Sequence, residues 1–391
     1  MPRRTVRATA LLVLFVSGCA AGNGAGVGTA DRAPDHTGSA ARSASVSGGP
    51  ISSRLIERRC DLADDLPVAD CYWFEVPEDR SSPDSGRIRL WVAVVHGTGS
   101  MASDLPAIGL AGGPGDTDST AWVSGNLVFA GGSNPPLVVL DQRGTGRSRP
   151  RLSCPELDPT ASATGSIDEL VAGRRAALTS CRDRLVAEGV DLNGYDTIES
   201  ATDVVELRRA LGIEHWIVQG WSYGGRLAQE VYRQDPDGVA GLVLDGTMTT
   251  RPWRLAEVID NAQSAIDKVD AACAAARQCP TEGEFKRNLL DAESRLDRDP
   301  REVEATGLVV DGPLLRAGVV EALYRSDLTE SLPGVVAALA TGDFSSLDVL
   351  AEQVTPAPQS DVEGTAEALR QIVTCADEGS DPDGMRLLTE G

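Results

Sequence analysis

The chain has 391 residues, of which 41% are hydrophobic and 24% are charged, so it can build the core of one large domain or two smaller ones unaided. Lys and Arg total 36 against 58 Asp and Glu, which gives a formal net charge of -22. A surface this acidic repels phosphate backbones, and we therefore expect no nucleic-acid partner.

The first residues have the pattern of an export signal. Three arginines precede the apolar run Ala8–Val16, which is too short to span a bilayer. The tetrapeptide that follows, Val16–Cys19, resembles the lipobox of bacterial lipoproteins, in which the cysteine is lipidated. We predict a signal peptide over 1–18 and a lipid anchor at Cys19, on the outer face of the cell membrane. A plain secretory signal with an incidental cysteine is the alternative.

Residues 19–50 hold the predicted anchor and then a stretch rich in Ala, Gly and Ser, which predicts a flexible linker. Short apolar runs rich in β-branched residues come next and indicate buried strands. They lie at residues 72–76, 88–95, 105–110, 137–140, 216–218 and 239–244. Helical patterns separate the later runs, at 167–188, 200–211 and 222–234. The alternation predicts an α/β domain over 51–250 with a mostly parallel sheet, entered through an antiparallel hairpin that turns at 80–86.

The pattern changes after Gly246. Helical periodicity fills residues 253–376, and no convincing strand appears there. An all-helical insertion after a sheet strand predicts a cap or lid over the active site, which we assign to 251–391. The sequence ends at Gly391 without a terminal strand, so we expect a fold truncated before its last strands, with an exposed sheet edge. A frameshift, a premature stop or a wrongly defined gene would each explain this.

Eight cysteines in an exported chain predict disulfides. Close spacing suggests the pairs Cys60–Cys71, Cys154–Cys181 and Cys273–Cys279, although spacing alone does not fix connectivity. With Cys19 assigned to lipid, Cys375 is expected to lack a partner.

The segment Gly220–Gly225 fits the pattern Gly-x-Ser-x-Gly, between a predicted strand and a predicted helix. A turn this sharp would hold Ser222 in a strained conformation with its Oγ exposed, and side chains at Gly220 and Gly224 would collide in it. Ser222 is therefore the predicted nucleophile. An inert serine in a glycine-rich turn is the competing interpretation.

A second glycine-rich segment follows the strand that ends at Leu110. Gly112, Gly113 and Gly115 form a loop that can turn backbone N–H groups toward a substrate carbonyl. Pro114 has no N–H, so we expect Gly113 to supply one oxyanion-hole donor and Tyr223, just after the nucleophile, to supply the other.

A third motif, Asp141–Ser148, combines charged side chains with glycines after a buried strand. We expect it to lie near the carboxyl edge of the sheet, where ligands bind in open α/β folds. Its Asp141 and Arg143 predict a loop cross-linked by hydrogen bonds, which is structural support and not proton-transfer machinery.

In chain order, with the glycine loop first, Asp141–Ser148 second and Gly220–Gly225 last, the three motifs resemble the proline iminopeptidase family, and within it the exported tripeptidyl aminopeptidases and related lipoproteins of actinobacteria. The resemblance covers about residues 55 to 377, with Ala111 standing where many members have histidine. It implies an α/β-hydrolase fold and hydrolysis of a peptide or of a small amide or ester, with Ser222 as nucleophile and release of short N-terminal units. No cofactor is expected for this chemistry, and no metal, because no zinc-type spacing or dinucleotide fingerprint is present.

The sequence contains only three histidines, His36, His96 and His215, and none of them follows Ser222. In this fold the order is Ser, then Asp or Glu, then His, so the catalytic base is missing. Asp245 is a weak candidate for the acid. Three interpretations remain open: a serine aminopeptidase, a non-catalytic or decayed lipoprotein of the same fold, and a carboxylesterase or lipase.

Overall fold

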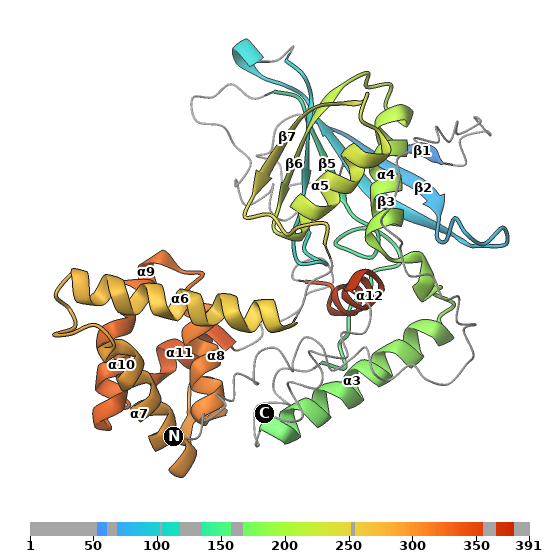
Figure 1. The fold of residues 1–391 in the computed structure, drawn as a ribbon. Coiled ribbons are helices and arrows are strands. Elements are labelled where there is room, and N and C mark those ends of the chain that lie inside the picture. Colours follow the sequence, from blue (N-terminus) through green and yellow to red (C-terminus); the bar gives the residue numbers. More distant parts are fainter. Residues whose placement is uncertain are drawn as a thin grey trace, which may run out of the picture.

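The computed structural model describes residues 53–60, 69–101, 104–117, 135–157, 167–251, 255–354 and 365–378. The predicted signal peptide, Cys19, the linker and His36 lie outside them. A seven-stranded sheet of order β1-β2-β3-β5-β4-β6-β7 forms the centre (Figure 1). Its strands are β1 (Arg54–Arg58), β2 (Ala69–Pro77), β3 (Arg87–Val95), β4 (Ala107–Leu110), β5 (Leu137–Asp141), β6 (Trp216–Trp221) and β7 (Val239–Asp245).

The predicted division of the sheet is confirmed. β2 and β3 form the antiparallel hairpin, and β3 joins the rest by antiparallel pairing with β5. From there β5, β4, β6 and β7 run parallel. Every residue of β4 and β5 is buried, as continuous apolar runs predict for central strands. The strand β1 was not predicted, because this short edge strand holds only two apolar residues, Leu55 and Ile56, between charged ones.

Helices α4 (Thr197–Ala210) and α5 (Tyr223–Gln234) lie along one face of the sheet (Figure 1). The helix α3 (Ile167–Ala187) and the short turns η2 (Gly99–Met101) and η3 (Leu192–Gly194) complete this part of the chain. Asp196 caps α4 by accepting a hydrogen bond from the Glu199 N–H. Leu227, Val204 and Val218 all lie in the core between these helices and the sheet.

A second group of helices has an apolar core of its own, which contains Phe285, Leu289, Leu315 and Val336. It comprises α6 (Leu255–Ala275), α7 (Glu284–Arg298), α8 (Gly312–Ala322), α9 (Ser326–Thr329), α10 (Leu332–Thr341) and α11 (Leu347–Val354) (Figure 1). The expectation that this segment has no strand is wrong. A small hairpin, β8 (Arg301–Val303) with β9 (Leu308–Val310), connects α7 to α8, and its strands are too short to produce a visible alternation.

The helix α12 (Glu367–Glu378) does not pack with that group. Its residues Ala368, Leu369 and Val373 are buried in the same core as α4, α5 and the sheet. The predicted cap range 251–391 is therefore wrong for α12, because its apolar side chains cover the main domain.

Three predicted disulfides are confirmed: Cys60–Cys71, Cys154–Cys181 and Cys273–Cys279. The expectation that Cys375 lacks a partner is wrong, because Cys375 is also disulfide-bonded. Its partner is none of the other six cysteines in the described residues.

Among the described residues β7 ends the strand order and pairs on one side with β6. Its residues Val243 and Leu244 are 46% and 40% exposed, which is unusual for apolar residues of a parallel sheet. No helix of the described residues has both the length and the apolar character that crossing a membrane requires.

Candidate active site

Ser222 stands between the end of β6 and the start of α5 with φ 54° and ψ −122°. A non-glycine residue at positive φ is strained, and it persists only where the surrounding structure holds it. Three backbone hydrogen bonds do so here. The Ser222 N–H donates to the Asp245 carbonyl at 3.0 Å, and the Ser222 carbonyl accepts from the N–H groups of Gly225 (3.1 Å) and Met248 (3.0 Å).

The glycines of the turn are required by space. A Cβ at Gly220 would overlap the Gly224 carbonyl, and a Cβ at Gly224 would overlap the Leu110 carbonyl at the end of β4. The collisions that were expected at these two positions are therefore confirmed by the geometry. The close approach of Gly224 to Leu110 also shows that the turn packs directly against the carboxyl end of β4.

The loop after β4 lies beside Ser222. A Cβ at Gly112 would come within 3.1 Å of the Ser222 Cβ, so the backbone of Gly112 borders the serine side chain. Gly113 and Gly115 both have positive φ, +102° and +103°, which favours glycine. Tyr223 is the first residue of α5, and an N–H in the first helical turn has no acceptor within the helix. The glycine loop and the first turn of α5 thus both adjoin Ser222.

The Asp141–Ser148 loop is cross-linked by its own hydrogen bonds and is bonded to the start of the glycine loop. Buried Asp141 accepts a hydrogen bond from the Arg147 N–H at 2.8 Å, and the Ser148 Oγ donates to the Asp141 carbonyl at 2.6 Å. Gln142 Nε2 donates to the Ala111 carbonyl at 3.0 Å, next to the glycine loop. The sequence analysis did not single out Gln142, although its place inside the motif was a usable signal.

Arg143 is fully buried and makes no contact with Ser222 in the described hydrogen-bond network. Its guanidinium forms a two-point ion pair with Asp203 and donates to the carbonyls of Glu78 (2.7 Å) and Gly194. Arg80 joins the same cluster through Asp203, Glu199 and Glu206. These contacts give Arg143 a structural role, since all of their partners lie outside the Ser222 turn.

A second buried network was missed by the sequence analysis. The hydroxyl of Tyr223 lies 2.8 Å from Thr197 Oγ1, which donates to the Asp377 carboxylate at 2.5 Å. Burial raises the pKa of the Asp377 carboxyl and also raises the pKa of Tyr223. Asp377 is 180 residues from Thr197 in the chain, and no local pattern could have linked the two.

The described histidines lie away from Ser222. His96, just past the end of β3, is exposed and bonds Asp70 at 2.8 Å. His215 comes just before β6, whereas Ser222 comes just after it, and its Nδ1 bonds the Asp237 carbonyl at 2.9 Å. Asp245 approaches Ser222 through its backbone carbonyl, and its side chain is exposed. The site thus has a strained serine and backbone donors, and neither described histidine is placed to act as its base.

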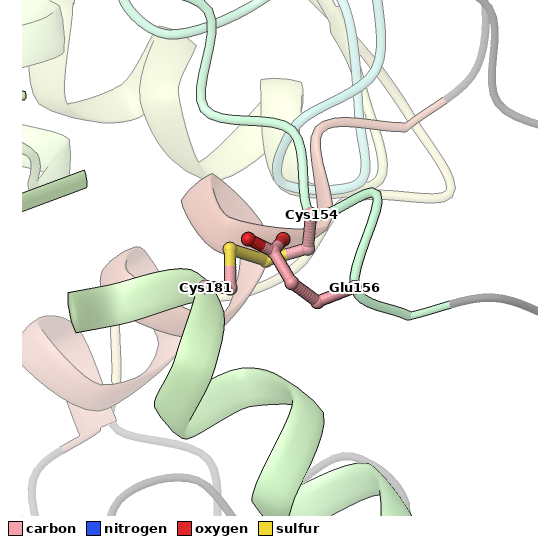
Figure 2. A group of neighbouring side chains, drawn as sticks. All are labelled: Cys154, Glu156 and Cys181. Atoms are coloured by element: carbon pink, nitrogen blue, oxygen red, sulfur yellow. A yellow bond between two sulfur atoms is a disulfide. The ribbon is translucent and has the colours of Figure 1, made fainter. Parts of the chain in front are cut away.

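One group of residues has the composition of a metal site. Cys154, Glu156 and Cys181 bring their ligand atoms within 4.8 Å of one another (Figure 2). The two cysteines, however, form a disulfide, and Glu156 pairs with Arg184 at 2.6 Å. Because a disulfide offers no thiolate and the arginine occupies the carboxylate, these residues do not fit a metal ion.

Comparison with known proteins extends these observations. Residues 136–344 match the family model described as alpha/beta hydrolase fold. The chain is 23% identical over 348 residues to the serine protease Hip1 of Mycobacterium tuberculosis, covering 82% of this chain and 65% of that protein. It is 31% identical over 144 residues to a probable proline iminopeptidase of Streptomyces coelicolor, covering 37% of this chain and 33% of that protein.

Among solved structures, the proline iminopeptidase of Mycobacterium smegmatis is 16% identical, with a TM-score of 0.36, and covers 81% of this chain and 86% of its own. The chain spans 65% of the length of the Hip1 relative. The resemblance to proline iminopeptidases that the three motifs predict is confirmed at the level of sequence.

Proposed function

We propose that this chain, which belongs to the α/β hydrolase fold family, carries the nucleophile and oxyanion site of a serine hydrolase that cleaves peptides. The observation that carries the proposal is Ser222 at φ 54° between β6 and α5, bordered by the Gly112 backbone. A strained serine on a strand-to-helix turn is the arrangement in which this fold exposes a nucleophilic Oγ.

In the proposed reaction, Ser222 Oγ attacks the substrate carbonyl, the C–N bond breaks and the protonated amine leaves, and water then hydrolyses the acyl-enzyme ester to release the carboxylic acid and restore the serine. The N–H groups of Gly113 and Tyr223 stabilise the negative charge that develops on the carbonyl oxygen. Removal of one such donor typically costs about 10²–10³ in rate. The proton of Ser222 needs a base, and the described part of the chain offers no histidine beside it. We therefore expect turnover by these 391 residues alone to be slow.

For the substrate, we propose a peptide with a free amino terminus from which short units are released. The names of the relatives support this choice, since they include a serine protease and a proline iminopeptidase. An exported location belongs to the same proposal, and the three described disulfides suit an oxidising compartment. Ester hydrolysis and loss of catalysis are the alternative outcomes.

A direct test compares three substrates on the purified chain: a tripeptide 4-nitroanilide with a free amino terminus, the same compound acetylated, and 4-nitrophenyl butyrate. Labelling by a fluorophosphonate, located by mass spectrometry, reports Ser222 independently of turnover. Ser222→Ala should abolish both signals, and Ser345→Ala, in an exposed position after α10, should leave them unchanged.

Preference for the free amino terminus supports an aminopeptidase, and preference for the ester supports an esterase. Absence of both labelling and turnover in the parent chain would overturn the catalytic proposal for these 391 residues.

A further inference from the structure

The helix α12 is connected to both backbone segments next to Ser222. The residues just before it bond directly to the glycine loop, and Asp377 in its last turn is linked to Tyr223 through Thr197. These contacts join parts of the chain that are more than 100 residues apart, as the separations of 249 and 180 residues show.

The first contact is with the glycine loop. The Ala366 N–H donates to the Gly115 carbonyl at 2.8 Å, and Thr365 Oγ1 donates to the Asp116 carboxylate at 2.6 Å. A Cβ at Gly115 would lie 2.7 Å from the Ala366 carbonyl, so the two backbones are in close contact. Thr365 and Ala366 therefore fix the far side of the loop that carries the Gly113 N–H.

The second contact is with Tyr223. Asp377 accepts hydrogen bonds from the Thr197 N–H (3.3 Å) and from Thr197 Oγ1 (2.5 Å), and it lies 3.6 Å from the Arg226 guanidinium. Because the single hydroxyl hydrogen of Thr197 goes to the carboxylate, Thr197 Oγ1 accepts from the Tyr223 hydroxyl. Tyr223 and Thr197 are buried and Asp377 is partly buried, and hydrogen bonds in such surroundings are costly to break.

Between these contacts α12 is held firmly in place. Ala368, Leu369 and Val373 are at most 5% exposed, and the Ala368 N–H donates to the Leu152 carbonyl at 3.1 Å. A helix of 12 residues is about 18 Å long. A packed helix of this length transmits a displacement at one end to the other, since protein interiors yield little.

We infer that α12 is a brace that positions both oxyanion donors, with Thr365 and Asp377 as positioning residues that act on the Gly113 loop and on Tyr223. The inference rests on the proposed function for the meaning of the two N–H groups. The brace itself is a property of the fold and can be tested without catalysis.

The test uses the full chain and three threonine variants. Thr197→Val removes the central hydroxyl at nearly constant shape, Thr197→Ser restores a hydroxyl, and Thr365→Val removes the bond to Asp116. Thr202→Val is the matched control, because Thr202 is on the same helix as Thr197 and bonds only the Ile198 carbonyl and Gln234. The measurement is amide hydrogen exchange by mass spectrometry, together with the rate of fluorophosphonate labelling of Ser222.

We expect Thr197→Val to raise the rate of amide hydrogen exchange in peptides covering 220–227 by roughly three- to tenfold, which is the range that loss of one hydrogen bond gives. The rate of fluorophosphonate labelling of Ser222 should fall by a similar factor. Thr365→Val should do the same for peptides covering 111–117. Peptides from α7 and α10 should not change, and Thr197→Ser should return both readouts to the parent values. Unchanged exchange at 220–227, a uniform rise across the whole chain, or failure of serine to rescue would each overturn the inference.

The two proposals fail in different ways. A parent chain that fluorophosphonate does not label would refute the proposed chemistry at Ser222 and leave the exchange result to decide on the brace. Labelling that is equal in Thr197→Val and the parent, with raised exchange at 220–227, would overturn the positioning role.

Discussion

The guanidinium of Arg143 donates to both carboxylate oxygens of Asp203, with Nε at 2.7 Å from Oδ2 and Nη2 at 2.8 Å from Oδ1. Both side chains are buried, and the pair joins the loop after β5 to the middle of α4. Nearby Asp203 and Glu199 raise the pKa of Arg143 against the opposing effect of burial, so the charge is kept. The Asp141–Ser148 loop is thus fixed to α4 by a buried ion pair, and neither member of that pair contacts Ser222 in the described hydrogen-bond network.

Arg143→Ala should therefore be strongly destabilising. Removal of one member of a buried ion pair leaves the other charge uncompensated, which costs about 3–5 kcal/mol. Arg80 still reaches Asp203 and should reduce the loss toward the lower value. Urea denaturation measures the change. Arg182→Ala is the control, because Arg182 pairs with Asp183 at the surface, and it should cost less than about 1 kcal/mol. Equal losses in the two variants would contradict this account.

The turn at Ser222 should not accept a methyl group. Gly224→Ala places a Cβ onto the Leu110 carbonyl, and because both atoms belong to buried backbone neither can move easily. We expect a loss of about 1–3 kcal/mol or more, together with loss of fluorophosphonate labelling at Ser222.

The control for this variant is Gly173→Ala. Gly173 lies inside α3, and an added Cβ meets nothing within 4 Å. The substitution should stabilise the chain by about 0.5–1 kcal/mol, since alanine is the better helix residue. Thermal unfolding of both variants checks the pair, and a stable Gly224→Ala protein with normal labelling would refute the steric argument.

What could be predicted from the sequence is what depends on neighbours in the chain. The buried strand 137–140 and the Gly220–Gly225 turn each carry their signal within a few residues, and both are where they were expected. The close disulfides are local in the same sense. Asp377 gave no such signal, because its partner Thr197 is brought to it only by the packing of α12. Local patterns also could not show that α12 packs on the main domain, because its apolar periodicity fits the core of the sheet and the core of α6–α11 equally well.

The exposed edge of β7 should promote self-association. Val243 and Leu244 are half exposed on a strand that pairs on one side only, and such edges template further pairing. Val243→Lys adds a charge there and should lower the sedimentation-equilibrium association constant by roughly tenfold or more. Val186→Lys, at an exposed valine of α3, should leave association unchanged. A parent chain that stays monomeric at high concentration would contradict the prediction.

Asp377 should make stability depend on pH in the opposite direction to a typical surface carboxylate. Burial raises the pKa of Asp377 above its unfolded value, so the folded state holds this proton more tightly. Stability from this group is fully present below the unfolded pKa and is lost as pH rises through the folded pKa. Asp377→Asn removes the titration, so the Tm of the variant minus that of the parent should become more positive between about pH 4 and about pH 8.

Asp343→Asn is the control of opposite sign, because hydrogen bonds from Ser345 lower the pKa of Asp343 and its contribution to stability appears only above the unfolded pKa. The Tm difference for that variant should become more negative over the same range. Parallel curves for Asp377→Asn and the parent would show that this carboxyl has an ordinary pKa in the folded protein.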